Sequence, residues 1–205
     1  MITAATTVAE VEIPISERGP SPRKVIVAYG FWLFLLSDII LFSALFAAYA
    51  VLSGRGAGGP TGVQLFHRDN VLVETGCLLF SSFTCAMMSL AIDARHRGLM
   101  AVGALLTLAL GAAFLWLELS EFAGMIAHGA GPARSAFLSA FFALVGMHGL
   151  HVSIGLCWLV SMVAQVFTLG WRPMVLGRLA CFSLFWHALD IVWIGVFTIV
   201  YLGAR

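Results

Sequence analysis

The chain has 205 residues, of which 61% are hydrophobic and only 10% are charged, and its formal net charge is +1. So few polar side chains cannot cover the surface of a water-soluble globule of this size, which excludes a soluble domain. The composition therefore predicts an integral membrane protein.

The first 24 residues differ in composition from the rest of the chain. They contain three glutamates and three prolines, and they lack the apolar core of a secretory signal. Residues 1–24 are therefore predicted to be a flexible polar tail. Residues 25–205 then form one transmembrane domain.

Five long apolar runs follow this tail, and prolines and basic residues fall between the runs or near their ends. Each run exceeds the roughly 20 residues that a helix needs to cross a hydrocarbon core of about 30 Å. We predict an all-α polytopic fold, a bundle of five transmembrane helices. The predicted spans are residues 25–52, 71–94, 99–127, 137–168 and 176–202.

The distribution of lysine and arginine predicts the orientation of the bundle. Seven of these residues fall on the side of the N-terminus: Arg18, Arg23, Lys24, Arg95, Arg97, Arg172 and Arg178. Four fall on the opposite side: Arg55, Arg68, Arg134 and Arg205. Basic residues concentrate in cytoplasmic loops, so the N-terminus is expected in the cytoplasm and the C-terminus in the periplasm.

The fourth run contains the stretch FFALVGMHGLHVSIG at residues 141–155. Its Gly149 and Ser153 form a pair of small residues four apart, which allows a second helix to approach closely. His148 and His151 are three residues apart and therefore share a helix face. This helix is expected to lie inside the bundle.

Eight ionisable side chains fall within the predicted spans: Asp38, Glu74, Glu118, Glu121, His148, His151, His187 and Asp190. A carboxylate near the centre of a membrane costs about 2.5 to 3.5 kcal/mol even on the lenient insertion scale, so such residues normally face the bundle interior. No lysine or arginine lies at the depth of Asp38, which is therefore expected to be protonated or bonded to a neighbouring helix.

Three neighbouring helices each carry a polar pair with three-residue spacing: Glu118 with Glu121, His148 with His151, and His187 with Asp190. Each pair shares one face of its helix, so the three helices can present these pairs to one another. The favoured interpretation is a structural network, in which imidazoles donate to carboxylates and some carboxyl groups stay protonated. Such a network fixes helix register and contains no catalytic residue.

Two metal-binding interpretations are alternatives to this network. Di-iron helical bundles use a Glu-x-x-His motif, whereas the pairs here are Glu-x-x-Glu, His-x-x-His and His-x-x-Asp. A haem held between two histidines of neighbouring helices would need only two of the three histidines His148, His151 and His187. A transporter is disfavoured because no proline interrupts a span and no inverted repeat is visible, but these features do not exclude a channel.

Four segments carry a resemblance to a known family: GFWLFLLSDIILFSALFAAYAVL in the first span, GPTG at residues 59–62 followed by VLVETGCLLFSS, FLSAFFALVGMHGLHVSIG, and SLFWHALDIVWIGVFTIVYL. Together they resemble subunit III of the haem-copper terminal oxidases. The similarity is closest to the five-helix form found in bacterial cytochrome bo-type ubiquinol oxidases, and it covers nearly all of residues 29–203. The related subunits of cytochrome c oxidases usually have two further N-terminal helices.

The resemblance implies a non-redox accessory subunit of a proton-pumping quinol oxidase in the bacterial plasma membrane. It implies no metal or other cofactor in this chain, haem and copper in subunit I, structural phospholipid, and subunits I, II and IV as partners. No nucleic-acid partner is expected. The alternatives are subunit III of a cytochrome c oxidase and, from another class, a free-standing five-helix metal or haem protein.

The resemblance also assigns family positions to several of the polar residues. Asp38 matches a family glutamate known for its reaction with carbodiimide, and it is one methylene shorter than that glutamate. Five other residues match family positions directly: Glu121, His148, His151, His187 and Asp190.

Overall fold

The computed structural model describes residues 23–53 and 68–203. These residues form five long helices, α1 (Arg23–Leu52), α3 (Arg68–Asp93), α4 (Arg97–Ala127), α5 (Ala136–Leu169) and α6 (Pro173–Val196), and α6 continues as a π-helix, η2 (Phe197–Leu202). All five are long and apolar enough to cross a membrane, which confirms the predicted all-α, five-helix architecture. Residues 1–22 of the predicted tail and the GPTG segment lie outside the described residues.

The ends of the helices follow local sequence signals. Ser135 caps the start of α5, where its hydroxyl oxygen accepts a hydrogen bond of 3.2 Å from the backbone N–H of Leu138. Proline is favoured at the first position of a helix, and α6 begins at Pro173, three residues before the predicted start of the last span. Gly170, with a φ of 72°, ends α5.

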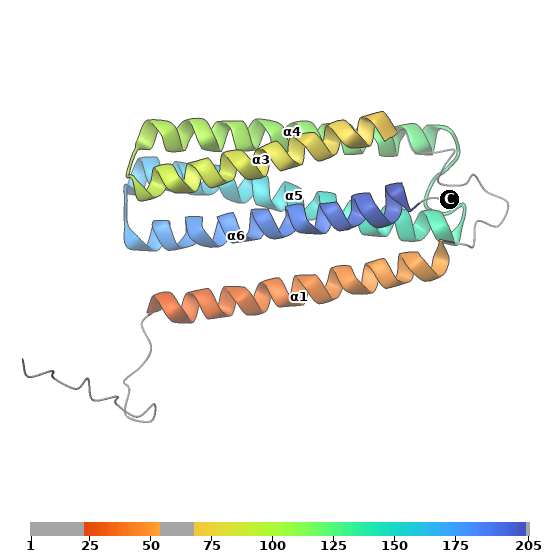
Figure 1. Ribbon diagram of the computed structural model, residues 1–205, viewed down its shortest axis with the longest axis horizontal. Coiled ribbons are helices and arrows are strands. Elements are labelled where there is room, and N and C mark those ends of the chain that lie inside the picture. Colours follow the sequence, from red (N-terminus) through yellow and green to blue (C-terminus); the bar gives the residue numbers. More distant parts are fainter. Residues whose placement is uncertain (1–22, 54–67, 204–205) are drawn as a thin grey trace, which may run out of the picture.

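The helices lie side by side and alternate in direction, so that their ends gather at two ends of the molecule (Figure 1). One end holds the start of α1, the α3–α4 turn and the α5–α6 turn, and is called the turn end below. The other end holds the start of α3, the α4–α5 connection and η2, and is called the Tyr201 end.

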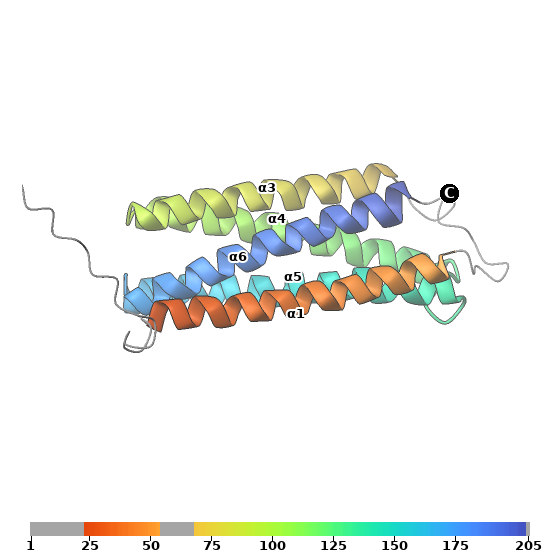
Figure 2. The same ribbon diagram turned by 60° about the horizontal axis from the view of Figure 1, so that its bottom comes forward.

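The core of the bundle lies among α3, α4, α5 and α6. Helix α3 packs against α4 and α6, while α5 packs against α1, α4 and α6. Figure 2 shows α1 at the edge of the bundle, beside α5 and α6. The largest fully buried side chains come from the four core helices and include Trp186, Trp193, Phe114 and Phe141.

Two glycines of α4 allow close contacts with the neighbouring helices. At Gly103, an added Cβ would lie 2.9 Å from the Cβ and 3.1 Å from the Cα of Met88, so the backbones of α3 and α4 are nearly in contact there. At Gly111, an added Cβ would meet the indole of Trp186 at 3.0 Å. The tight α3–α4 hairpin thus depends on small residues, as is usual where apolar side chains gain nothing by leaving lipid.

Candidate functional site

Three glutamates come together near the Tyr201 end. Glu74 of α3 and Glu118 and Glu121 of α4 interact electrostatically with one another, and we call them the carboxyl cluster. The side chains of Glu74 and Glu118 are 1% and 2% exposed. The Tyr201 hydroxyl of η2 donates to Glu121 Oε2 over 3.4 Å.

Helix α5 closes the carboxyl cluster through Gly149. A Cβ added there would lie 2.7 Å from both carboxyl oxygens of Glu118, so the carboxyl group rests directly on the α5 backbone. Both oxygens of Glu74 and Glu118, and Oε1 of Glu121, have no hydrogen-bond partner within the described part of the chain. Three adjacent carboxylates without cations cannot all be ionised at this depth without a large cost.

His148 lies in an aromatic environment. Its side chain is fully buried, and neither ring nitrogen has a hydrogen-bond partner among the described residues. Its ring centroid lies 5.1 Å from that of Trp193, 5.7 Å from Phe114 and 6.4 Å from Phe42. The described part of the chain therefore provides no carboxylate partner for His148.

His151 instead meets a carboxylate on the first helix. Its Nδ1–H donates to the carbonyl of Met147 over 2.8 Å, because a carbonyl oxygen can only accept, and this turns Nε2 towards α1. Nε2 lies 3.7 Å from Asp38 Oδ1, and the two side chains are 13% and 19% exposed. Asp38, which has no lysine or arginine at its depth, thus faces an imidazole across the α1–α5 interface.

The pair on the last span faces α3. His187 Nδ1 lies 3.2 Å from Ser82 Oγ, and Asp190 interacts with the same serine and with His187. Asp190 Oδ1 is a further buried oxygen with no hydrogen-bond partner in the described ranges. Within the described residues, no hydrogen bond joins the Glu118–Glu121, His148–His151 and His187–Asp190 pairs to one another.

A row of hydroxyl groups on α3 extends the polar contact with α6. The indole Nε1 of Trp193 donates to Thr75, and that of Trp186 donates to Ser81, each over 3.1 Å. Closer to the turn end, Ser89 Oγ lies 3.2 Å from Ser183 Oγ. We call these contacts, together with those of Ser82, His187 and Asp190, the α3–α6 seam. Sequence reasoning missed it because serine and threonine in membrane helices so often bond only to their own backbone.

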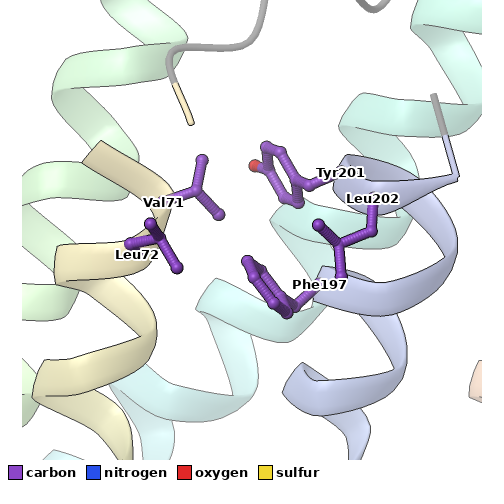
Figure 3. A pocket seen from close by; sticks show the side chains of 5 residues that line it. All are labelled: Val71, Leu72, Phe197, Tyr201 and Leu202. Carbon is purple, nitrogen blue, oxygen red and sulfur yellow. The ribbon is translucent and has the colours of Figure 1, made fainter. Parts of the chain in front are cut away.

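The described residues contain no group of three or more His, Cys, Asp and Glu side chains arranged to hold a metal ion. A small apolar pocket does lie at the Tyr201 end, between the first turn of α3 and η2 (Figure 3). Its lining consists of Val71, Leu72, Phe197, Tyr201 and Leu202.

Comparison with known proteins identifies the family. Residues 21–204 match the family model described as cytochrome c oxidase subunit III. The chain belongs to this family. The resemblance predicted from the four sequence segments is thereby confirmed, and so is the prediction of a subunit without a catalytic centre of its own.

The relatives of this subunit III include quinol oxidase subunits from Pseudomonas and Bacillus. The chain is 53% identical over 176 residues to cytochrome bo(3) ubiquinol oxidase subunit 3 of Pseudomonas aeruginosa, covering 85% of this chain and 83% of the relative. It is 52% identical to the protein of the same name from Pseudomonas putida, covering 84% of each. It is 43% identical to quinol oxidase subunit 3 of Bacillus subtilis, covering 84% of this chain and 85% of the relative.

Proposed function

We propose that the chain is subunit 3 of a bacterial quinol oxidase, a respiratory haem-copper enzyme that couples ubiquinol oxidation and oxygen reduction to proton pumping. The observation that carries this proposal is the 53% identity, across 85% of the chain, to a ubiquinol oxidase subunit 3. In this function the chain is a non-redox accessory subunit of the cytoplasmic membrane. It stabilises the catalytic subunit, which holds the haem and copper, and assembles with subunits I, II and IV.

The polar groups of the spans support an accessory function. They divide into a glutamate cluster, a histidine enclosed by aromatic rings, one imidazole–carboxylate pair and a seam of hydroxyl bonds. These contacts join α1 to α5, α3 to α4 and α3 to α6, so each stabilises a helix interface. The eight predicted site residues are therefore proposed to be structural, lipid-related or proton-related.

We propose that the turn end lies in the cytoplasm. Eight lysines and arginines fall within the described ranges, and six of them belong to the turn end. Those six are Arg23, Lys24, Arg95, Arg97, Arg172 and Arg178. The remaining two, Arg68 and Arg134, belong to the Tyr201 end. The positive-inside rule then assigns the N-terminus to the cytoplasm and the C-terminus to the periplasm.

We also propose that phospholipid binds along α1. Among the described helices, α1 has substantial contacts only with α5 and α6. Its outward side chains include Tyr29, Trp32 and Ile40, which are 68%, 52% and 70% exposed. An aromatic and aliphatic surface of this kind suits acyl chains, with the amphipathic rings at the headgroup level.

Purification of the complex through a tag on this chain tests the proposed function. We expect a haem- and copper-containing catalytic subunit to co-purify in stoichiometric amount, and the complex to oxidise a ubiquinol analogue but not reduced cytochrome c. Oxidation of cytochrome c alone would assign the chain to the cytochrome c branch of the family. Isolation of the chain without an oxidase would contradict the proposal altogether.

The same preparation tests the absence of a cofactor. After the subunits are separated, this chain is expected to contain no stoichiometric iron or copper by metal analysis, and no haem by its visible spectrum. One equivalent of haem that is lost on replacement of His148, His151 or His187 would support the alternative that the chain is a free-standing haem protein.

A further inference from the structure

The α3–α6 seam runs along most of the length of α3. It begins with Ser89 and Ser183, only about 6 Å along the helix from the last residue of α3 at the turn end. Cys85 Sγ lies 4.0 Å from the same Ser183 hydroxyl. One turn further into the bundle, Ser82 contacts His187 and Asp190. On α6, a hydroxyl, an imidazole and a carboxyl group thus follow one another at successive turns, opposite hydroxyl and thiol groups of α3.

The last contact of the seam lies beside the carboxyl cluster. Beyond Asp190, the next polar contact on α6 is the bond from Trp193 to Thr75, and Thr75 is adjacent in sequence to Glu74. The indole N–H can only donate, so this contact holds α3 and α6 together there, and the step from Asp190 to Glu74 needs water. The step from Asp190 to Glu74 is flanked by Asp190 Oδ1 and both Glu74 oxygens, none of which has a partner among the described residues. Buried polar atoms of this kind are usually hydrogen-bonded to ordered water, and water can complete a path for protons.

Among the described residues, the carboxyl cluster has no comparable polar connection to the Tyr201 end. Each of the four core helices places a buried apolar side chain on that side of the cluster, namely Val71 of α3, Met125 of α4, Leu138 of α5 and, in η2, Val200. The pocket in Figure 3 is likewise lined by apolar side chains, apart from the hydroxyl of Tyr201 that bonds to Glu121. The polar surroundings of the cluster are therefore asymmetric along the membrane normal.

We propose that the α3–α6 seam carries protons between the turn end and the carboxyl cluster, which holds them inside subunit 3. The groups that relay protons are the hydroxyls of Ser89, Ser183 and Ser82 with His187, Asp190 and intervening water, because the two indole N–H groups of the seam can only donate. In each transfer one O–H or N–H bond breaks as another forms, and the proton ends on a carboxylate of Glu74, Glu118 or Glu121. No electron and no other bond is involved. The proposal goes beyond the accessory function, since it assigns the subunit a proton-holding site of its own.

Other titratable groups near this path come from every neighbouring element. Helix α6 contributes His187 and Asp190, α3 contributes Cys85, and η2 contributes Tyr201. Helix α5 contributes His148, which packs on aromatic rings, and the His151–Asp38 pair joins α5 to α1. The described parts of the spans place no lysine or arginine at the depth of the carboxyl cluster, so among the described residues its neutralisation falls to protons.

Hydrogen–deuterium exchange in the intact oxidase tests the proposal. Infrared spectra of the membrane-reconstituted complex, perfused with D₂O buffer, would follow the carbonyl band of protonated carboxyl groups. The band that disappears in Glu118→Gln is assigned to the cluster. Ser82→Ala, which interrupts the seam, is expected to slow deuteration of that band by about tenfold, the factor that one lost hydrogen-bonding group in the barrier would produce.

Thr84→Ala provides a matched control. Thr84 lies two residues from Ser82 and bonds across to Thr107 of α4 over 2.8 Å, on the opposite side of α3 from the seam. Thr107 keeps its bond to the Gly103 carbonyl in that variant, so no buried hydroxyl is left without a hydrogen bond. The cluster band in Thr84→Ala is expected to deuterate at the wild-type rate. That result would show that slower exchange in Ser82→Ala reflects loss of the path and not a general loosening of α3.

Two results would overturn the proposal. One is a cluster band that exchanges at the wild-type rate in both Ser82→Ala and Ser183→Ala. The other is a wild-type spectrum from which Glu118→Gln removes no protonated carboxyl band, because the cluster would then hold no proton. Both are measured in a complex that has already co-purified, so either result would overturn the proton path while leaving the proposed function in place.

Discussion

At the scale of single residues, a polar group in a membrane helix is defined by the neighbour it meets. His148 and His151 share a helix face, yet one packs among aromatic rings and the other meets Asp38. A three-residue spacing predicts a shared face, but not which helix covers it. The sequence therefore predicted which ionisable residues lie within the spans, but it could not assign the partner of each.

Replacements of Asp38 distinguish a structural role of this residue from a role in proton transfer. With His151 Nε2 at 3.7 Å, Asp38→Asn keeps the size and a polar contact, while Asp38→Leu leaves the imidazole unpaired at a cost of about 1 to 3 kcal/mol. We expect the Asn variant to assemble normally with wild-type turnover, and the Leu variant to lose subunit 3 or its lipid during purification. Subunit stoichiometry and quinol oxidation would be measured on the same preparation.

A different outcome for the Asn variant would change the function assigned to this residue. Normal assembly combined with reduced turnover or reduced proton pumping would mean that Asp38 exchanges a proton during the reaction. The hypothesis that the Asp38–His151 pair has only a structural role would then be wrong. His151→Asn gives an independent check, because it removes the imidazole while leaving Asp38 in place.

At the scale of helices, long apolar runs predict the existence of each element, and their ends differ from the structure by at most three residues. The largest differences occur at the starts of α3 and α6. In α6 the helix starts at Pro173, because proline suits the first turn and the missing N–H is not needed there. The π-helix at residues 197–202 had no sequence signal.

Inter-helix packing could be predicted only in part, because close contacts depend on which small residues face each other. Gly149 was predicted to permit a close helix approach, and it does contact Glu118. The glycine that brings α3 and α4 together, Gly103, was not identified, because its neighbour Met88 gives no signal. The seam of serines and threonines on α3 was missed because such residues in membrane helices so often bond only to their own backbone.

Gly103→Ala tests the packing of the α3–α4 hairpin. The new Cβ would lie 2.9 Å from the Met88 Cβ and 3.1 Å from its Cα, and backbone atoms cannot move aside as a flexible side chain can. We expect the hairpin to lose about 1 to 3 kcal/mol of stability, the usual cost of overpacking. The measurement is the temperature at which subunit 3 dissociates from the detergent-solubilised oxidase.

Gly124→Ala in the same helix is the matched control. Nothing lies within 4 Å of a Cβ added at Gly124, so this change adds helix propensity without a clash. Its dissociation temperature should equal or exceed that of the wild type. Equal temperatures for the two alanine variants would mean that α3 and α4 are not in close contact at Gly103.

At the scale of the whole molecule, the bundle is asymmetric both across and along the membrane. Helix α1 is attached at the edge through α5 and α6, while the carboxyl cluster and the seam lie among the core helices. Basic residues gather at the turn end, and the carboxyl cluster lies nearer the Tyr201 end. The proposed orientation thus places the start of the seam on the cytoplasmic side, where protons enter a respiratory oxidase that pumps them outward.

Reporter fusions test this orientation. Five spans require the two chain ends to lie in different compartments, and six of the eight described basic residues at the turn end predict that the N-terminus is cytoplasmic. A reporter that is active only in the periplasm should therefore be inactive at the N-terminus or in the turn at residues 94–96. It should be active in the connection at residues 128–135 and after Arg205. The inverse pattern at all four sites would reverse the orientation and place the start of the seam in the periplasm. Equal activity at both chain ends would instead mean that one of the five helices does not span the membrane.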